Sequence, residues 1–289
     1  AKPMKTQQFY GSRILHVSDE SDDLKPVKVL SVANQKGGVG KTTTAINLGT
    51  ALAAVGKRVL LMDLDPQGNA STGLGIDPSK RTVTMYDVLV DKTDLKSAIM
   101  RTAVPNLFIA TSSVDLSSAD VELVDDQKRV LRLRAALKDL QSFEDEFDYV
   151  LIDCPPSLNL LTLNALAASQ SVIVPLQAEF FALEGLSQLM LTIREVRQSL
   201  NPVLKIEGIV LTMFDSRNNL SQQVEQDVRE NLGDLVYKTI VPRNVRLSEA
   251  PSFGMPAILY DHKSRGSIAY QKLAAEFLRR ENRKVAKVG

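Results

Sequence analysis

The chain contains a single cysteine, Cys154, and no tryptophan among its 289 residues. One cysteine cannot form a disulfide within the chain, and it cannot supply the thiolates of an iron–sulfur cluster or an all-cysteine metal site. Histidine is also scarce, with only His16 and His262. We therefore expect a protein of a reducing, cytoplasmic compartment, in which Cys154 is a buried structural thiol rather than a nucleophile.

Long apolar runs and a strong excess of one charge are absent as well. No apolar segment is long enough to cross a bilayer, and the first residues lack the charged-then-apolar pattern of a secretion signal. Lysine and arginine number 35 and aspartate and glutamate 34, which gives a net charge of +1. This balance argues against a protein coated in basic charge, although it allows a local basic face that binds nucleic acid.

The pattern along the chain predicts one folded domain with two short flanking segments. Residues 1–26 are polar, carry the acidic stretch Asp19–Asp23, and are expected to form a flexible or docking extension. Residues 27–281 are expected to form the domain, and residues 282–289 a basic C-terminal tail. Within the domain, short β-branched runs alternate with helical stretches, which is typical of an α/β fold with a mostly parallel twisted sheet and helices on both faces.

Several of the expected strands are almost continuously apolar, as in Val59–Met62 and Val150–Ile152, which indicates burial on both faces. The expected strands are Val27–Ala33, Arg58–Met62, Leu107–Ala110, Tyr149–Ile152, Ser171–Pro175, Ile206–Thr212 and Leu235–Ile240. The expected helices are Thr42–Val55, Gln127–Gln141, Ser157–Ser169, Leu183–Ser199, Ser221–Asn231 and Ile268–Arg280.

A glycine-rich loop joins the first expected strand to the first expected helix, with the sequence Lys36-Gly37-Gly38-Val39-Gly40-Lys41-Thr42-Thr43. Glycines allow backbone N–H groups to turn inward around phosphate oxygens, and the helix directs its positive N-terminal end toward the same anion. The Lys41 ammonium suits the β- and γ-phosphates, and the Thr42 hydroxyl suits Mg²⁺. The loop therefore predicts binding of ATP with Mg²⁺.

The loop departs from the usual phosphate-binding pattern at Gln35, where a glycine is expected. With Lys36, it resembles the deviant Walker-A motif of the ParA/MinD-type ATPases. The resemblance implies a homodimer that encloses two ATP molecules, with Lys36 of each chain reaching the nucleotide of the other as a catalytic residue. The residues alone leave open a solvated Lys36.

Two acidic segments follow buried strands. Asp63-Leu64-Asp65-Pro66-Gln67 lies where open α/β sheets bind ligands; its carboxylates could bind Mg²⁺ or position water, and its composition also suits a simple turn. It resembles the second ParA motif, which implies that Asp65 orients the attacking water near the metal. The run from Tyr149 to Asp153 resembles a Walker-B strand, which implies that Asp153 lies near Mg²⁺ through water or the Thr42 hydroxyl.

Later segments support the same resemblance, which covers about Val27 to Arg280 and includes Glu179–Gly185 and Leu211–Asp215. It is specifically to the small chromosome-partitioning, Soj-like ParA proteins. It implies that Pro242 and Asn244 border adenine and ribose, and that Arg217 and Arg246 bind DNA; by themselves these would be ordinary exposed arginines. It further implies non-specific DNA binding by the ATP-bound dimer, slow hydrolysis stimulated by a ParB-type partner, and association with the nucleoid.

Two other functions remain open from composition alone. A MinD-like membrane-cycling regulator would need a C-terminal amphipathic helix, but Ile268, Leu273, Phe277 and Leu278 suit core packing, so we expect no membrane partner. A metabolic P-loop enzyme, such as a small-molecule ligase or kinase, would need substrate motifs that we do not find.

Overall fold

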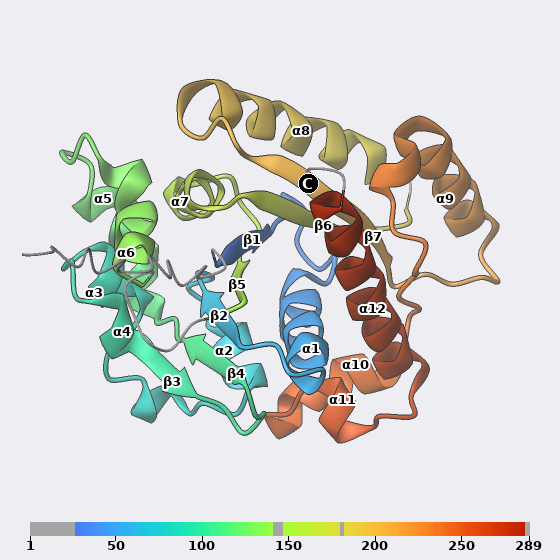
Figure 1. Cartoon of the computed structure of the whole chain (residues 1–289), viewed down its shortest axis with the longest axis horizontal. Helices are drawn as coiled ribbons and strands as arrows, with labels where there is room; N and C mark the ends of the chain where they lie inside the picture. The colour runs from blue at the N-terminus through green and yellow to red at the C-terminus, as the bar shows by residue number, and fades with distance from the viewer. Residues whose placement is uncertain (1–26, 141–146, 180–181, 287–289) are drawn as a thin grey trace, which may run out of the picture.

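The computed structural model describes residues 27–140, 147–179 and 182–286. The predicted extension 1–26 lies outside the described residues, as do residues 287–289 of the predicted tail and Phe180 and Phe181 of the segment Glu179–Gly185. The centre of the molecule is a seven-stranded sheet with the order β3-β4-β2-β5-β1-β6-β7 (Figure 1). The strands are β1 (Lys28–Val32), β2 (Val59–Asp63), β3 (Ile99–Arg101), β4 (Leu107–Ala110), β5 (Tyr149–Asp153), β6 (Ser171–Gln177) and β7 (Lys205–Thr212).

The central strands are buried on both faces because their side chains alternate between two apolar cores. On β5, Val150 and Ile152 face one core, and Leu151 faces the other. The second core is covered by α1 (Lys41–Ala54), α2 (Asn69–Gly73), α10 (Val245–Glu249), α11 (Ala257–Tyr260) and α12 (Arg265–Val285). The first core is covered by α3 (Met85–Leu89), α4 (Leu95–Ala98), α5 (Ala119–Glu122), α6 (Arg132–Leu140), α7 (Leu160–Ala168), α8 (Ala182–Ser199) and α9 (Asn219–Leu232).

All neighbouring strands pair in parallel except β3, which pairs antiparallel with β4. The predicted fold class is therefore confirmed. The sequence did not reveal β3, because three residues are too few to show a strand periodicity. The described chain also contains short 3₁₀ helices at Pro78–Lys80 (η1), Val114–Ser118 (η2), Arg129–Leu131 (η3), Gly233–Leu235 (η4) and Ala250–Phe253 (η5).

One predicted strand, Leu235–Ile240, is wrong. The segment forms only an isolated bridge between Val236 and Ile209 of β7. The carboxylate of Glu276 on α12 accepts hydrogen bonds from the backbone N–H groups of Lys238 and Thr239, at 2.8 and 2.9 Å. Because a helix side chain takes these donors, they cannot extend a ladder along β7.

The end of α12 also differs from the predicted domain boundary at residue 281. The helix continues to Val285, so residues 282–285, which the sequence assigns to the tail, are helical.

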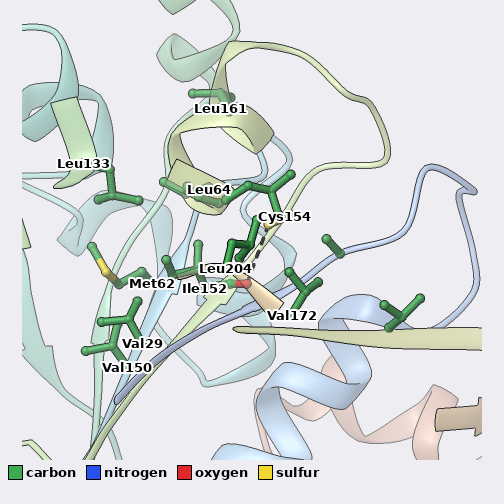
Figure 2. Close-up of a cluster of buried hydrophobic side chains, with 14 of the residues drawn as sticks. Val29, Met62, Leu64, Leu133, Val150, Ile152, Cys154, Leu161, Val172 and Leu204 are labelled. Carbon is green, nitrogen blue, oxygen red and sulfur yellow. Dashed lines mark hydrogen bonds between the residues drawn. The ribbon is translucent and has the colours of Figure 1, made fainter. Parts of the chain in front are cut away.

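Cys154 follows β5 and lies inside the first core, beside Ile152, Val172 and Leu64 (Figure 2). It is 1% exposed, and its Sγ donates a 3.8 Å hydrogen bond to the Ile152 carbonyl oxygen. Burial, and next the charge of Asp153, raise the pKa of the Cys154 thiol. A buried thiol with a raised pKa is a structural group, as the sequence predicts.

Candidate phosphate-binding site

The glycine-rich loop has the left-handed backbone that its sequence indicates. Gly38 and Gly40 have φ angles of 75° and 87°, which a side chain would strain. Gly40 is the residue before α1, so the first N–H groups of a 14-residue helix point into the loop. The Thr212 hydroxyl at the end of β7 donates a 2.8 Å hydrogen bond to the Val39 carbonyl oxygen. The glycines therefore permit the backbone conformation of the loop, and the Thr212 hydrogen bond attaches the loop to the sheet.

Lys41 places a buried cation inside this loop. Its side chain turns back so that Nζ donates a 2.8 Å hydrogen bond to the carbonyl oxygen of Lys36. Burial lowers the pKa of Lys41, while the nearby carboxylates of Asp153 and Asp65 act in the opposite direction. A partly desolvated ammonium among backbone N–H groups is suited to an anion with several negative charges.

Asp63 and Asp153 are neighbours in the register of β2 and β5, and their side chains lie on the sheet face that α1 covers. Asp63 accepts hydrogen bonds from the Ser71 amide at 2.8 Å and the Ser71 hydroxyl at 2.6 Å. Burial nevertheless raises the pKa of Asp63 to about 6.

Asp153 is completely buried, and neither of its carboxylate oxygens accepts a hydrogen bond from a described residue. Burial and the charge of Asp63 raise the pKa of Asp153, although the nearby Thr42 hydroxyl and Lys41 oppose the shift. A buried carboxylate without a donor is costly, and a cation close to it would remove that cost.

Asp65 lies just beyond β2 and is 8% exposed. Its Oδ1 accepts a 3.0 Å hydrogen bond from the Gln67 amide, so its turn position is fixed by the sequence Asp-Pro-Gln. Together, Asp65, Asp153 and the Thr42 hydroxyl offer the hard oxygen ligands that Mg²⁺ prefers. Within the described ranges, no group of three or more His, Cys, Asp or Glu side chains could hold a metal by itself. A Mg²⁺ ion bound here would therefore take its other ligands from phosphate oxygens. The residues present fit a Mg²⁺ ion that is bound in this way, together with a nucleotide.

Lys36 forms an ion pair with Glu179, which follows β6. Its backbone N–H donates a 3.0 Å hydrogen bond to Oδ1 of Asn34, whose Nδ2 donates to the Pro175 carbonyl oxygen at 2.7 Å. Lys36 is therefore partnered rather than merely solvated. No local sequence signal indicates a role for Asn34 or Glu179, because the contacts of both span more than 140 residues.

Thr43 and Thr42 line a small cavity of about 230 Å³ together with residues of α1, α2 and α10. Pro242 and Asn244 do not line that cavity. Pro242 forms a β-bridge with Phe214, which lies two residues after Thr212 at the end of β7. Thr212 in turn bonds the glycine-rich loop at Val39, so Pro242 is connected to the loop through this part of the chain. The Asn244 side chain accepts a 3.1 Å hydrogen bond from the Arg246 amide and so caps α10.

The two predicted DNA-binding arginines are exposed and partnered. The Arg217 side chain is 89% exposed and donates two 3.0 Å hydrogen bonds to the carboxylate of Asp215. Arg246 forms ion pairs with Glu249 at 2.8 Å and Asp261 at 3.4 Å. Exposed pairs of this kind are weak, so a phosphate group can replace the carboxylate at little cost.

Known proteins with similar sequences include chromosome partitioning proteins. Residues 27–206 match the family described as an AAA domain. The chain is 58% identical over 262 residues to the chromosome partitioning protein ParA of Caulobacter vibrioides, covering 91% of this chain and 98% of that protein. The chain belongs to the ParA/MinD family. Another member, the sporulation initiation inhibitor protein Soj of Bacillus subtilis, is 53% identical over 249 residues, which cover 86% of this chain and 97% of Soj.

Solved structures show the same family fold. One is the structure of cobyrinic acid a,c-diamide synthase from Mycobacterium smegmatis with bound ADP and magnesium. It has a TM-score of 0.77 and 40% identity, covering 89% of this chain and 96% of that one. The cell division ATPase MinD of Pyrococcus furiosus has a TM-score of 0.73 and 28% identity, covering 88% of this chain and 99% of MinD. The sequence prediction of a ParA/MinD-type chain is thus confirmed.

Proposed function

We propose that this ParA-family chain is a partitioning ATPase whose ATP-bound homodimer binds DNA without sequence preference and is released by hydrolysis. The observation that carries the nucleotide part is the unpaired, buried Asp153 beside Lys41 and Thr42. The partitioning part is supported by 53–58% identity to ParA and Soj. A ParB-type, centromere-bound partner would stimulate hydrolysis, and the protein would associate with the nucleoid.

In this proposal, ATP occupies the loop Lys36–Thr43, with Pro242 and Asn244 bordering its base and ribose. Mg²⁺, held directly by the Thr42 hydroxyl and near Asp65 and Asp153, would neutralise charge on the phosphates. Lys41 neutralises further charge from inside the loop. Lys36 leaves Glu179 and crosses to the nucleotide of the second chain, which makes the site complete only in the homodimer.

Asp65 then orients a water molecule for in-line attack on the γ-phosphate. Its backbone turn fixes its position, so the rate depends on how well dimer closure aligns the water. A carboxylate that orients water without removing its proton early supports a slow reaction, because phosphoryl transfer relies on positioning and charge stabilisation. A partner protein can then accelerate the reaction by improving the alignment.

Arg217 and Arg246 are the proposed DNA contacts. Both are exposed, and contacts to phosphates position a protein on DNA without reading its sequence. Each phosphate contact releases counterions, so affinity should fall steeply with salt.

The test is retention on DNA of unrelated sequences with ATP, ADP or no nucleotide, across a salt series. We expect binding with ATP alone, and a log–log salt slope that falls by about 1 for each of Arg217→Ala and Arg246→Ala, counted per chain. Arg197→Ala, on the exposed side of α8, is the matched control and should leave the slope unchanged. Nucleotide-independent binding, or equal slopes in all three variants, would contradict the proposal.

Two alternatives are less well supported. No helix in the described parts of the chain is long and apolar enough to cross a membrane. A MinD-like amphipathic anchor would need a free apolar stripe, but Leu273 and Phe277 of α12 are 1% and 0% exposed. The prediction of core packing is wrong for Ile268, which is 40% exposed. A diamide synthase activity, as named for the 40% identical structure, is disfavoured by the higher identity to partitioning proteins.

A further inference from the structure

A large groove runs along the flank of the molecule, and Pro242, the proposed neighbour of the ATP base, is one of its lining residues. The groove has a volume of about 1240 Å³ and lies between α12 on one side and β7 with the segment 238–242 on the other. Side chains of α12 line it from Arg265 near the helix start to Lys284 near its end. Figure 1 shows the C-terminal end of α12 near β7 and the start of α12 near α10 and α11.

The groove is strongly cationic. Its lining includes six exposed lysine and arginine residues, and none of them forms an ion pair with a residue in the described ranges. The six are Lys205, Lys238, Arg265, Lys272, Arg279 and Arg283.

The acidic groups of the groove do not balance these charges. Glu207 is 3% exposed and already paired with Lys28 and Lys284. Glu276 is 6% exposed and paired with Arg280 at 2.9 Å. Asp234 is the remaining acidic lining residue, so the groove carries a clear excess of positive charge.

The cations on α12 are regularly placed. Arg265, Lys272 and Arg279 are seven residues apart, which places them on one helix face at intervals of about 10 Å. Lys205 and Lys238 stand on the opposite wall. An extended, polyanionic chain segment fits such a double row better than a compact ligand with one charge.

The N-terminal end of β1 adjoins the same groove. Lys28, its first residue, bonds Glu207 at 2.9 Å and also pairs with Glu281 of α12. Four acidic residues, Asp19, Glu20, Asp22 and Asp23, precede Val27 by four to eight positions. Extended chain of that length spans at most about 13 to 29 Å, which reaches the middle of the groove from its C-terminal end.

We propose that the acidic segment Asp19–Asp23 of this chain binds in the cationic groove along α12. Charge complementarity and the short connection to β1 support this occupant, because a tethered segment meets the groove at a high effective concentration. The segment would then compete with DNA phosphates for part of the cationic surface. This consequence alone rests on the proposed DNA-binding function.

The proposal is tested in the full-length, nucleotide-free protein by disulfide trapping. Ser21→Cys places a thiol in the acidic segment, and Ala275→Cys places one on the exposed groove face of α12. Cys154 does not interfere, because it is 1% exposed. We expect rapid formation of an intramolecular disulfide under a mild oxidant, scored as a monomeric species at low protein concentration.

Charge-reversal variants then test whether the cations of the groove are responsible for the rate of disulfide trapping. K272E with R279E, in the double-cysteine chain, should slow trapping by roughly tenfold. The matched control K80E with K138E makes the same charge change at exposed positions on η1 and α6 and should stay within about twofold of the parent. Neutralising the segment with D19N, E20Q, D22N and D23N should slow trapping as strongly as the groove variant.

The outcomes separate this inference from the proposed function. Equal trapping rates in the groove variant and its control would overturn the docking. Loss of DNA retention in K272E with R279E, with trapping unchanged, would overturn it too and assign the groove to DNA. Charge-dependent trapping in a protein that never binds DNA would support the docking while contradicting the proposed function.

Discussion

The phosphate-binding edge of the sheet and the groove along α12 both collect charge, but they do so in opposite ways. At the sheet edge the charges are buried: Asp153 is 0% exposed, and none of the described residues donates a hydrogen bond to it. Along the groove six of the eight lining lysines and arginines are exposed and form no ion pair with a described residue, whereas the buried acids Glu207 and Glu276 are fully partnered. The first region needs a cation-bearing ligand, and the second needs a polyanion.

This difference determines how each region responds to its surroundings. Interactions among buried charges are strong and little screened, so the sheet edge can control chemistry at any ordinary salt concentration. Exposed cations act over about 10 Å at 0.1 M salt and are screened beyond it, so the groove suits reversible and salt-sensitive association.

The largest effect is expected at Asp65. Asp65→Ala should lower ATP hydrolysis by roughly 100-fold or more, because in the proposed mechanism Asp65 orients the attacking water. ATP-dependent dimerisation should persist, since Lys36 and Lys41 are unchanged. Phosphate release and light scattering measure the two properties, and the exposed Asp91→Ala is the control. Normal hydrolysis in the Asp65 variant would refute the assigned role.

The next effect concerns pH. Burial raises the pKa of Asp63 from 3.8 to about 6, so the native protein favours protonated Asp63. Protonated Asp63 therefore contributes up to about 3 kcal/mol to the free energy of unfolding. This contribution is fully present below pH 4 and is lost as the pH rises through about 6. Denaturant unfolding without nucleotide or Mg²⁺ should show this loss between pH 4 and 7.

Asp63→Asn should make that pH profile shallower. Some dependence should remain, because the pKa of Asp153 is raised as well and its ionisation is also unfavourable in the folded state. An identical profile in the variant would mean that Asp63 does not titrate in this range.

A smaller effect is expected from a partnered acid of the groove. Glu276→Gln should destabilise the protein by about 1 to 3 kcal/mol, because the Lys238 and Thr239 amides lose a charged acceptor. Amide exchange at these two residues should accelerate. Glu230→Gln, at an exposed position on α9, should change stability by less than about 0.5 kcal/mol. Equal free energies of unfolding for the two variants would contradict the stabilising role assigned to the hydrogen bonds of Glu276.

The smallest effect on the reaction is expected at Cys154. Cys154→Ala should leave ATP hydrolysis within about twofold and lower the free energy of unfolding by about 1 kcal/mol, because the substitution removes a buried sulfur atom from the core. Thiol-reactive reagents should likewise fail to inactivate the folded protein. A large loss of hydrolysis without unfolding would give this thiol a role in the reaction.

The sequence predicted those parts of the molecule that local chemistry determines. Gly38 and Gly40 must be glycine because their φ angles are positive, and the apolar run of β5 requires burial on both faces. The loop, its helix and the placement of Asp65 after β2 could therefore be predicted directly.

The parts that the sequence did not predict depend on contacts between distant residues. The Lys36–Glu179 pair, the Glu276 bonds that replace a strand at 238–239, and the groove between β7 and α12 all join segments far apart in the chain. The unpaired state of Asp153 is equally invisible in sequence, because it reflects which donors the fold fails to supply.

In the proposed mechanism, the nucleotide at the sheet edge controls the affinity of the exposed cations for DNA. The most direct test is the dissociation constant of the Asp65→Ala chain for DNA of unrelated sequence, measured with ATP and with ADP at one fixed salt concentration. We expect binding at least about tenfold tighter with ATP, because in the proposed mechanism only ATP closes the dimer and doubles the phosphate contacts. Equal dissociation constants with the two nucleotides would contradict the account.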